Sequence, residues 1–268
     1  MIIFKTAPRL AAALVFLNLL LVAGARAQED WRAFNAGGVT INYTAADETE
    51  KTKLAGFISN GRQTVQKFFG RDFDKKFVVF VYPDRKALTT AWRTDWKVPD
   101  LETECWMVAS GTAEKFSLLA PRTWKTEACE HDPADTADTQ LVVTHELVHV
   151  YHGQHSPHPD FDGMDDVAWF VEGLAVYASG QLESQKMATA RDAIENGKAP
   201  ATLEKAWSGK YRYGVSGSIV KYVDARFGRK TILKMLGATT EKELLDILKL
   251  TEAELLDGWK KYVLENRL

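Results

Sequence analysis

The chain combines short apolar runs of strand character with longer segments whose apolar residues recur every three or four positions. Residues 39–43 alternate between apolar and polar side chains, which predicts a β-strand. Residues 46–69 place apolar side chains on one helical stripe that ends at Gly70, so we expect an amphipathic helix. Residues 77–82 form an unbroken apolar run bounded by Pro83, which is typical of a central strand.

The middle and end of the chain carry different patterns. Residues 106–110 and 116–120 flank a short polar stretch and predict a β-hairpin. Further on, Thr240 and Thr251 each precede a glutamate by three residues, the capping box that opens a helix. The expected fold class is therefore α+β, with a small mixed sheet in the N-terminal half and a mostly helical C-terminal half.

The candidate chemistry lies in the sequence His-Glu-x-x-His at residues 145–149. Side chains four residues apart share one face of an α-helix, so His145 and His149 can present two imidazole nitrogens to one metal ion. Glu146 lies one step around the helix and can act as general base on a metal-bound water without being a ligand. Apolar neighbours indicate that this helix is buried, where a metal would satisfy the polar side chains. We therefore expect a Zn²⁺ site.

A catalytic zinc site needs a third protein ligand and one open position. Glu172 is the lone charge in the apolar run of residues 169–177, and a buried carboxylate is costly unless it binds a cation. Gly173 is small, which we expect to let this helix approach the histidine helix. The alternative is His155, at the last position of the metzincin pattern, but that pattern requires glycine where this chain has His152. Glu172 is the favoured ligand.

Other polar residues near the motif are weaker candidates for metal ligands. At 1.5 Å per residue, His152 lies roughly 10 Å along the helix from His145, too far to share one ion. We expect it to neighbour the site, face the substrate or be exposed at the helix end. His131, His155 and His158 fall in loop-like stretches and are expected to be exposed. The acidic residues 160–166 lack the EF-hand spacing, so their last aspartates are expected to cap the next helix.

The motifs at residues 145–149 and 169–177 resemble those of the gluzincin zinc metallopeptidases, in particular the peptidase MA-like group of secreted bacterial proteins. The second run is also similar to the Trp-x-x-Glu-Gly-x-Ala element of zinc aminopeptidases. The resemblance implies a zincin-like fold and a site in which His145, His149 and Glu172 bind zinc. It also implies hydrolysis of a peptide or protein substrate. By resemblance to other zincins, an edge strand at residues 116–120 would bind extended substrate by β-augmentation.

Residues 211–214, Tyr-Arg-Tyr-Gly, are similar to an aminopeptidase element whose tyrosine stabilises the tetrahedral intermediate. By position that tyrosine is Tyr211, with Tyr213 as the alternative. Two departures limit the resemblance. The Gly-Ala-Met-Glu-Asn signature that reads a free N-terminus is absent, so exopeptidase activity is not implied. Val176 stands where thermolysin-like enzymes place an aspartate beside the metal ligands.

The N-terminal end has the layout of a secretory signal peptide. Lys5 and Arg9 precede an apolar stretch, and an Ala-x-Ala site follows, which predicts cleavage after Ala27. The stretch is short for a stable membrane span, so a secreted or periplasmic product is expected. It would contain a strand-helix segment at residues 28–75 and a metallopeptidase domain at residues 76–268.

Charge and cysteine content add two constraints. Removal of three basic residues with the signal peptide takes the net charge from −2 to −5, and the absence of a basic block argues against nucleic-acid binding. Cys105 and Cys129 are the two cysteines, and a disulfide between them in an exported protein would contribute on the order of 3 kcal/mol. Two unpaired buried thiols are the alternative.

Four functions remain open from the sequence. The favoured one is a zinc-dependent peptidase with Glu146 as general base. The others are an exported zinc-binding module or envelope-associated partner without catalysis, a metzincin-type peptidase that uses His155, and a zinc amidase acting on cell-wall peptide links. Glu146 argues against the module, because a purely structural zinc site has no use for a base. These patterns determine neither the substrate nor the oligomeric state.

Overall fold

The computed structural model describes residues 30–182 and 185–266 of the chain. The predicted signal peptide, residues 1–27, lies outside the described residues. Within the described ranges, no helix combines the length and the apolar character that a membrane crossing requires.

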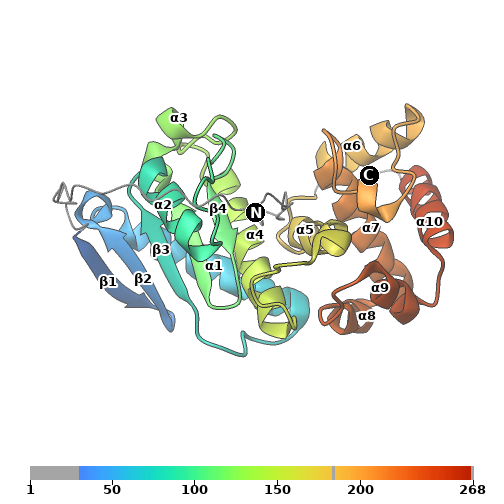
Figure 1. Cartoon of the computed structure of the whole chain (residues 1–268), viewed down its shortest axis with the longest axis horizontal. Helices are drawn as coiled ribbons and strands as arrows, with labels where there is room; N and C mark the ends of the chain where they lie inside the picture. The colour runs from blue at the N-terminus through green and yellow to red at the C-terminus, as the bar shows by residue number, and fades with distance from the viewer. Residues whose placement is uncertain (1–29, 183–184, 267–268) are drawn as a thin grey trace, which may run out of the picture.

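A five-stranded mixed sheet forms the N-terminal half (Figure 1). Its order is β1 (Trp31–Ala36), β2 (Val39–Thr44), β3 (Val78–Tyr82), β5 (Lys115–Leu119) and β4 (Ala109–Gly111). The first and last pairs are antiparallel, and β3 runs parallel to both of its neighbours. The predicted strands at residues 39–43 and 77–82 are confirmed, with β3 at the centre. The predicted hairpin is also present, but its first strand begins at Ala109 instead of Trp106.

Strand β1 was not predicted from the sequence, because none of its side chains is fully buried and the pattern is weak. It is joined to β2 by Gly37 and Gly38, which both have positive φ. Two consecutive residues of this conformation form the tight turn whose twist matches antiparallel strands. The strands of residues 30–75 thus belong to the same sheet as those of the following segment.

The edge of the sheet near the zinc motif is β4, not the strand at residues 116–120. Strand β5 pairs with β3 on one side and with β4 on the other, so its backbone is engaged on both sides. The prediction that residues 116–120 form an edge strand is wrong, because the hairpin folds back with its first strand outermost.

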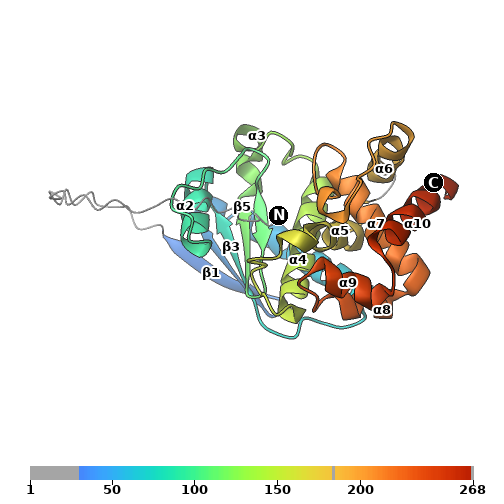
Figure 2. The same ribbon diagram turned by 45° about the vertical axis from the view of Figure 1, so that its right-hand side comes forward.

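Two long helices, α1 (Lys51–Phe69) and α4 (Thr136–His155), pack against each other beside the sheet (Figure 2). Helix α1 ends at Gly70, as predicted, and the φ of 73° at this glycine is the left-handed conformation common at helix ends. It begins later than predicted, because residues 45–47 form a separate 3₁₀ turn, Ala45–Asp47. Helix α2 (Arg85–Asp95) packs against β3 and β5.

The remaining described chain is helical, as predicted. It contains α5 (Ala168–Ala178), α6 (Gln185–Glu195), α7 (Arg212–Phe227), α8 (Arg229–Met235), α9 (Glu241–Leu248) and α10 (Glu252–Glu265). Both predicted capping boxes are present, at Thr240 and Thr251. A short helix, α3 (Trp124–Glu127), precedes α4, and 3₁₀ turns lie at Pro121–Thr123, Asp165–Val167 and Leu203–Lys205.

Helix α5 packs closely on α7, and Gly173 makes this possible. A Cβ atom added at Gly173 would lie 2.5 Å from the carbonyl oxygen of Ser216 in α7. From the sequence, Gly173 was expected to let this helix approach the histidine helix. The close approach at Gly173 exists, but its partner is α7. The predicted capping of α5 by aspartates is also wrong, because Val167 occupies its N-cap position without a side-chain hydrogen bond.

A disulfide joins Cys105 and Cys129, with Cα atoms 5.3 Å apart. The loop that it closes is held to α2 by Arg85, whose guanidinium donates to the carbonyl oxygens of Glu104, Cys105, Met107 and Glu127. These bonds fix the segment around Trp106, which borders the candidate site.

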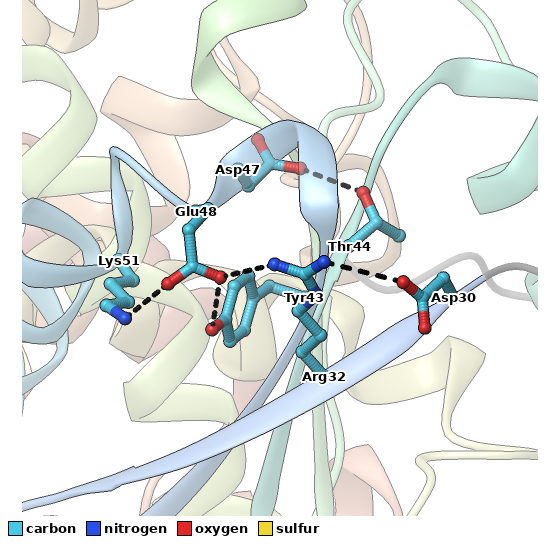
Figure 3. A network of polar contacts seen from close by, with 7 residues as sticks. All are labelled: Asp30, Arg32, Tyr43, Thr44, Asp47, Glu48 and Lys51. Atoms are coloured by element: carbon cyan, nitrogen blue, oxygen red, sulfur yellow. Dashed lines mark hydrogen bonds and ion pairs between the residues drawn. The ribbon is translucent and has the colours of Figure 1, made fainter.

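A second polar network ties the β1–β2 hairpin to the start of α1 (Figure 3). The Glu48 carboxylate accepts hydrogen bonds from Lys51, Arg32 and Tyr43. These three bonds lower the pKa of Glu48 from its ordinary 4.5 to about 2, so the carboxylate stays ionised far into acid.

Candidate metal centre

The His-Glu-x-x-His motif lies in the middle of α4, as predicted. Helix α4 begins at Asp135, whose carboxylate accepts hydrogen bonds from the backbone N–H groups of Ala137 and Asp138. Its central turns are buried, and His149 is fully inaccessible to solvent. Helix α5 brings Glu172, also fully buried, to the same place.

The three predicted ligands form a tight triangle of donor atoms. Their Nε2 and Oε2 atoms lie 3.1 Å apart for His145 and His149, 3.3 Å for His145 and Glu172, and 3.5 Å for His149 and Glu172. Tetrahedral zinc with bonds of 2.0 to 2.2 Å requires ligand atoms about 3.3 to 3.6 Å apart. The donor set and its spacing therefore fit one metal ion of this kind.

Burial and mutual contact shift the pKa values of two groups in this triangle. Burial lowers the pKa of His149. Burial alone would raise the pKa of Glu172, but the imidazoles of His149 and His145 hold that pKa well below its usual range. Neutral imidazole and ionised carboxylate are the forms that coordinate a cation.

Gln181 orients one of the two histidines. Its Oε1 lies 2.9 Å from Nδ1 of His145. Because a carbonyl oxygen only accepts, Nδ1 of His145 carries the proton and its Nε2 lone pair points into the triangle. Nδ1 of His149 has no hydrogen-bond partner among the described residues. Gln181 lies in the turn after α5 and was not found from the sequence, where no spacing rule singles it out.

A cavity of about 250 Å³ opens beside the triangle and reaches Glu146. Glu146 and His145 line one side, next to Gln181. The remaining lining residues are Trp106, Val108, Ala109, Glu130, His131, Asp138, Val142, Lys186 and Tyr213. A carboxylate adjacent to a metal position and open to a cavity has the placement that a general base requires.

Tyr213 lines this cavity, whereas Tyr211 lines a different one of about 790 Å³. Tyr211 is the N-cap residue of α7, and Lys210 lies over its ring. Side chains two residues apart on a helix point about 200° apart, so only one of them can face the metal triangle. The structure brings Tyr213, the alternative from the sequence, to His145 and Glu146.

The remaining histidines lie outside the metal triangle, and His155 is half-buried at the end of α4 rather than exposed in a loop. His155 is the last residue of α4, and its Nε2 lies 3.3 Å from Asp74, outside the metal triangle. The helix continues through residue 155, so the turn that the metzincin geometry needs does not form there. His158 is exposed, as expected.

His152 is neither exposed nor in the cavity. Its ring is fully buried against Phe161 and Phe170, and burial lowers its pKa to about 3. His131 was expected to be exposed, but it is half-buried, pairs with Asp138 at 2.8 Å and lines the cavity. His152 thus neighbours the site, one of its three expected placements, because Phe161 contacts both His149 and His152. The expectation for His131 failed because it pairs with Asp138 in the first turn of α4.

No family model matches the sequence, and no curated protein matches it. Among solved structures, the chain is similar to a mutant M1 zinc metallopeptidase from Deinococcus radiodurans, with 16% identity and a TM-score of 0.49 over 90% of this chain and 53% of that one. A second crystal structure of that mutant, bound to a Tyr-Ser-Ala substrate, gives 15% identity and a TM-score of 0.42 over 87% and 51%. The chain spans about half the length of these proteins.

Proposed function

We propose that the protein is a secreted or periplasmic zinc-dependent peptidase. The observation that carries this proposal is the triangle of His145, His149 and Glu172, with donor atoms 3.1 to 3.5 Å apart and Glu146 beside it on an open cavity. Export is inferred from the sequence of residues 1–27 alone.

Each residue has a distinct task in this mechanism. Bound zinc would supply an acidic water and polarise the substrate carbonyl. Glu146 takes the proton of the attacking water and passes it to the leaving amine. Burial, and then the nearby Glu172, raises the pKa of Tyr213, so its phenol keeps a proton at neutral pH. Tyr213 can thus donate a hydrogen bond to the developing oxyanion.

The edge strand β4 supports a peptide substrate, because it borders the cavity and an edge strand can pair with an extended chain. A zinc amidase acting on cell-wall peptide links would use the same groups. An exported zinc-binding module would need the triangle but would leave Glu146 and Tyr213 without a role.

Substitution of Glu146 by Gln tests the mechanism. The zinc ligands remain, so zinc content and the melting temperature should stay close to wild type while peptide hydrolysis falls by several orders of magnitude. Zinc is measured by elemental analysis, and hydrolysis with a peptide library and with purified cell-wall peptides. Undiminished hydrolysis by the variant would refute the role of Glu146. Zinc-loaded wild type that cleaves neither substrate set would favour the binding module.

A further inference from the structure

Two cations lie against the ring of Tyr213 at the edge of the catalytic cavity. The Lys186 Nζ lies 5.6 Å from the ring centroid, and the Arg212 Cζ lies 5.1 Å from it. Arg212 is also held by Trp106 and Trp207, at 5.2 and 5.5 Å. Lys186 lines the cavity together with His145, Glu146 and Tyr213.

Neither cation forms an ion pair with any residue that the structure describes. Three carboxylates line the same cavity, those of Glu130, Asp138 and Glu146. Asp138 contacts His131 at 2.8 Å, and Glu130 is exposed. Lys186 is half-buried, and this burial lowers its pKa even though Asp138 acts in the opposite direction. Partial burial of an ammonium group without a carboxylate partner costs free energy, and a bound anionic ligand would offset that cost.

The position of Lys186 is fixed by the backbone rather than by a flexible loop. Helices α6 and α7 touch where Gly214 faces the first turn of α6. A Cβ atom at Gly214 would overlap the carbonyl oxygen of Lys186 and the hydroxyl of Thr189. The glycine of the Tyr-Arg-Tyr-Gly element therefore sets the distance between the Lys186 backbone and Tyr213.

We propose that Lys186 is the anchor for a carboxylate group of the substrate, and that Arg212, held against Trp106, Trp207 and Tyr213, adds a second positive charge nearby. This inference rests on the proposed peptidase function and gives it a substrate class, peptides that carry a carboxylate close to the cleaved bond. That carboxylate is either the free C-terminus of a short peptide or an acidic side chain.

Binding measurements on zinc-loaded Glu146→Gln protein test the anchor without turnover. Three peptides share one uncharged core: the first has a free C-terminal carboxylate, the second a C-terminal amide, and the third an amide with one added glutamate. By calorimetry, at least one of the carboxylate peptides should bind about tenfold or more tightly than the uncharged amide, as a charge-assisted hydrogen bond predicts. The preferred peptide identifies the source of the carboxylate.

Lys186→Met in the same background should erase this preference, while Lys186→Arg should retain most of it. Lys198→Met is the matched control, because Lys198 is exposed just beyond the other end of α6 and lines another cavity. Thermal melts verify that each variant is folded. Equal affinity for all three peptides, or a preference that survives Lys186→Met, would overturn the anchor.

Hydrolysis by the protein with Glu146 intact separates this inference from the proposed function. With Lys186→Met, KM for the carboxylate peptide should rise about tenfold toward the value for the amide, with little change in kcat. If the wild type cleaves none of the peptides but still binds the carboxylate forms more tightly, the anchor stands and the peptidase function fails.

Discussion

At the scale of single residues, the three residues of the candidate metal triangle could be predicted, whereas the groups around them could not. His145 and His149 follow from helical spacing, and Glu172 follows from the cost of a lone charge in an apolar run. Gln181 and Lys186 reach the site through turns and helix packing that no short motif encodes. For the same reason, the sequence did not show that Tyr213 lines the cavity and that Tyr211 does not.

Substitution of Gln181 tests whether the groups around the metal triangle contribute to zinc affinity. Gln181→Leu removes the acceptor for Nδ1 of His145, so the imidazole loses its fixed tautomer and orientation. We expect zinc affinity to fall about 10- to 100-fold, measured by competition with a fluorescent chelator. Gln181→Glu keeps an acceptor and should restore most of the affinity. Unchanged affinity in Gln181→Leu would show that His145 is positioned by packing alone.

At the scale of elements, strands and helices with one buried face were predicted, and those defined by pairing alone were not. The apolar run of β3 and the apolar stripe of α1 can be recognised in the sequence, because a buried face requires apolar side chains at regular positions. Strand β1 has few buried side chains, and the outer position of β4 depends on how the hairpin folds onto β3. Neither feature leaves a local signal.

The contact between the hairpin and α1 predicts a pH dependence. The pKa of Glu48 is lowered to about 2 by hydrogen bonds from Lys51, Arg32 and Tyr43, so this carboxylate stabilises the fold above its ordinary pKa. That stabilisation should disappear as pH falls from about 4.5 toward 2. Glu48→Gln should therefore be less stable than wild type at pH 7, and the difference should shrink over this window.

Chemical denaturation at several pH values measures the difference in free energy of unfolding. Glu114→Gln is a suitable control, because Glu114 is exposed and forms no ion pair with the residues described here. A Glu48→Gln difference that stays constant down to pH 2 would contradict the role of the network.

At the scale of the whole molecule, the metal triangle joins the two halves of the fold. Its histidines lie on α4, which packs on the sheet and α1, and its glutamate lies on α5, which packs on α7. A metal ion at this point would link both halves and stabilise the folded state. At a free concentration one hundred times its dissociation constant, such an ion contributes about 2.7 kcal/mol.

Thermal melts with and without zinc test this link and the choice of third ligand. Wild type should melt several degrees higher with zinc than after chelation. Glu172→Ala leaves two protein ligands and should lose this shift, whereas His155→Ala should keep it, because His155 contacts Asp74 and Tyr151 instead. The two variants must therefore be compared by their zinc-induced shifts and not by their melting temperatures alone. A shift lost in His155→Ala and retained in Glu172→Ala would reverse the ligand assignment and favour the metzincin geometry.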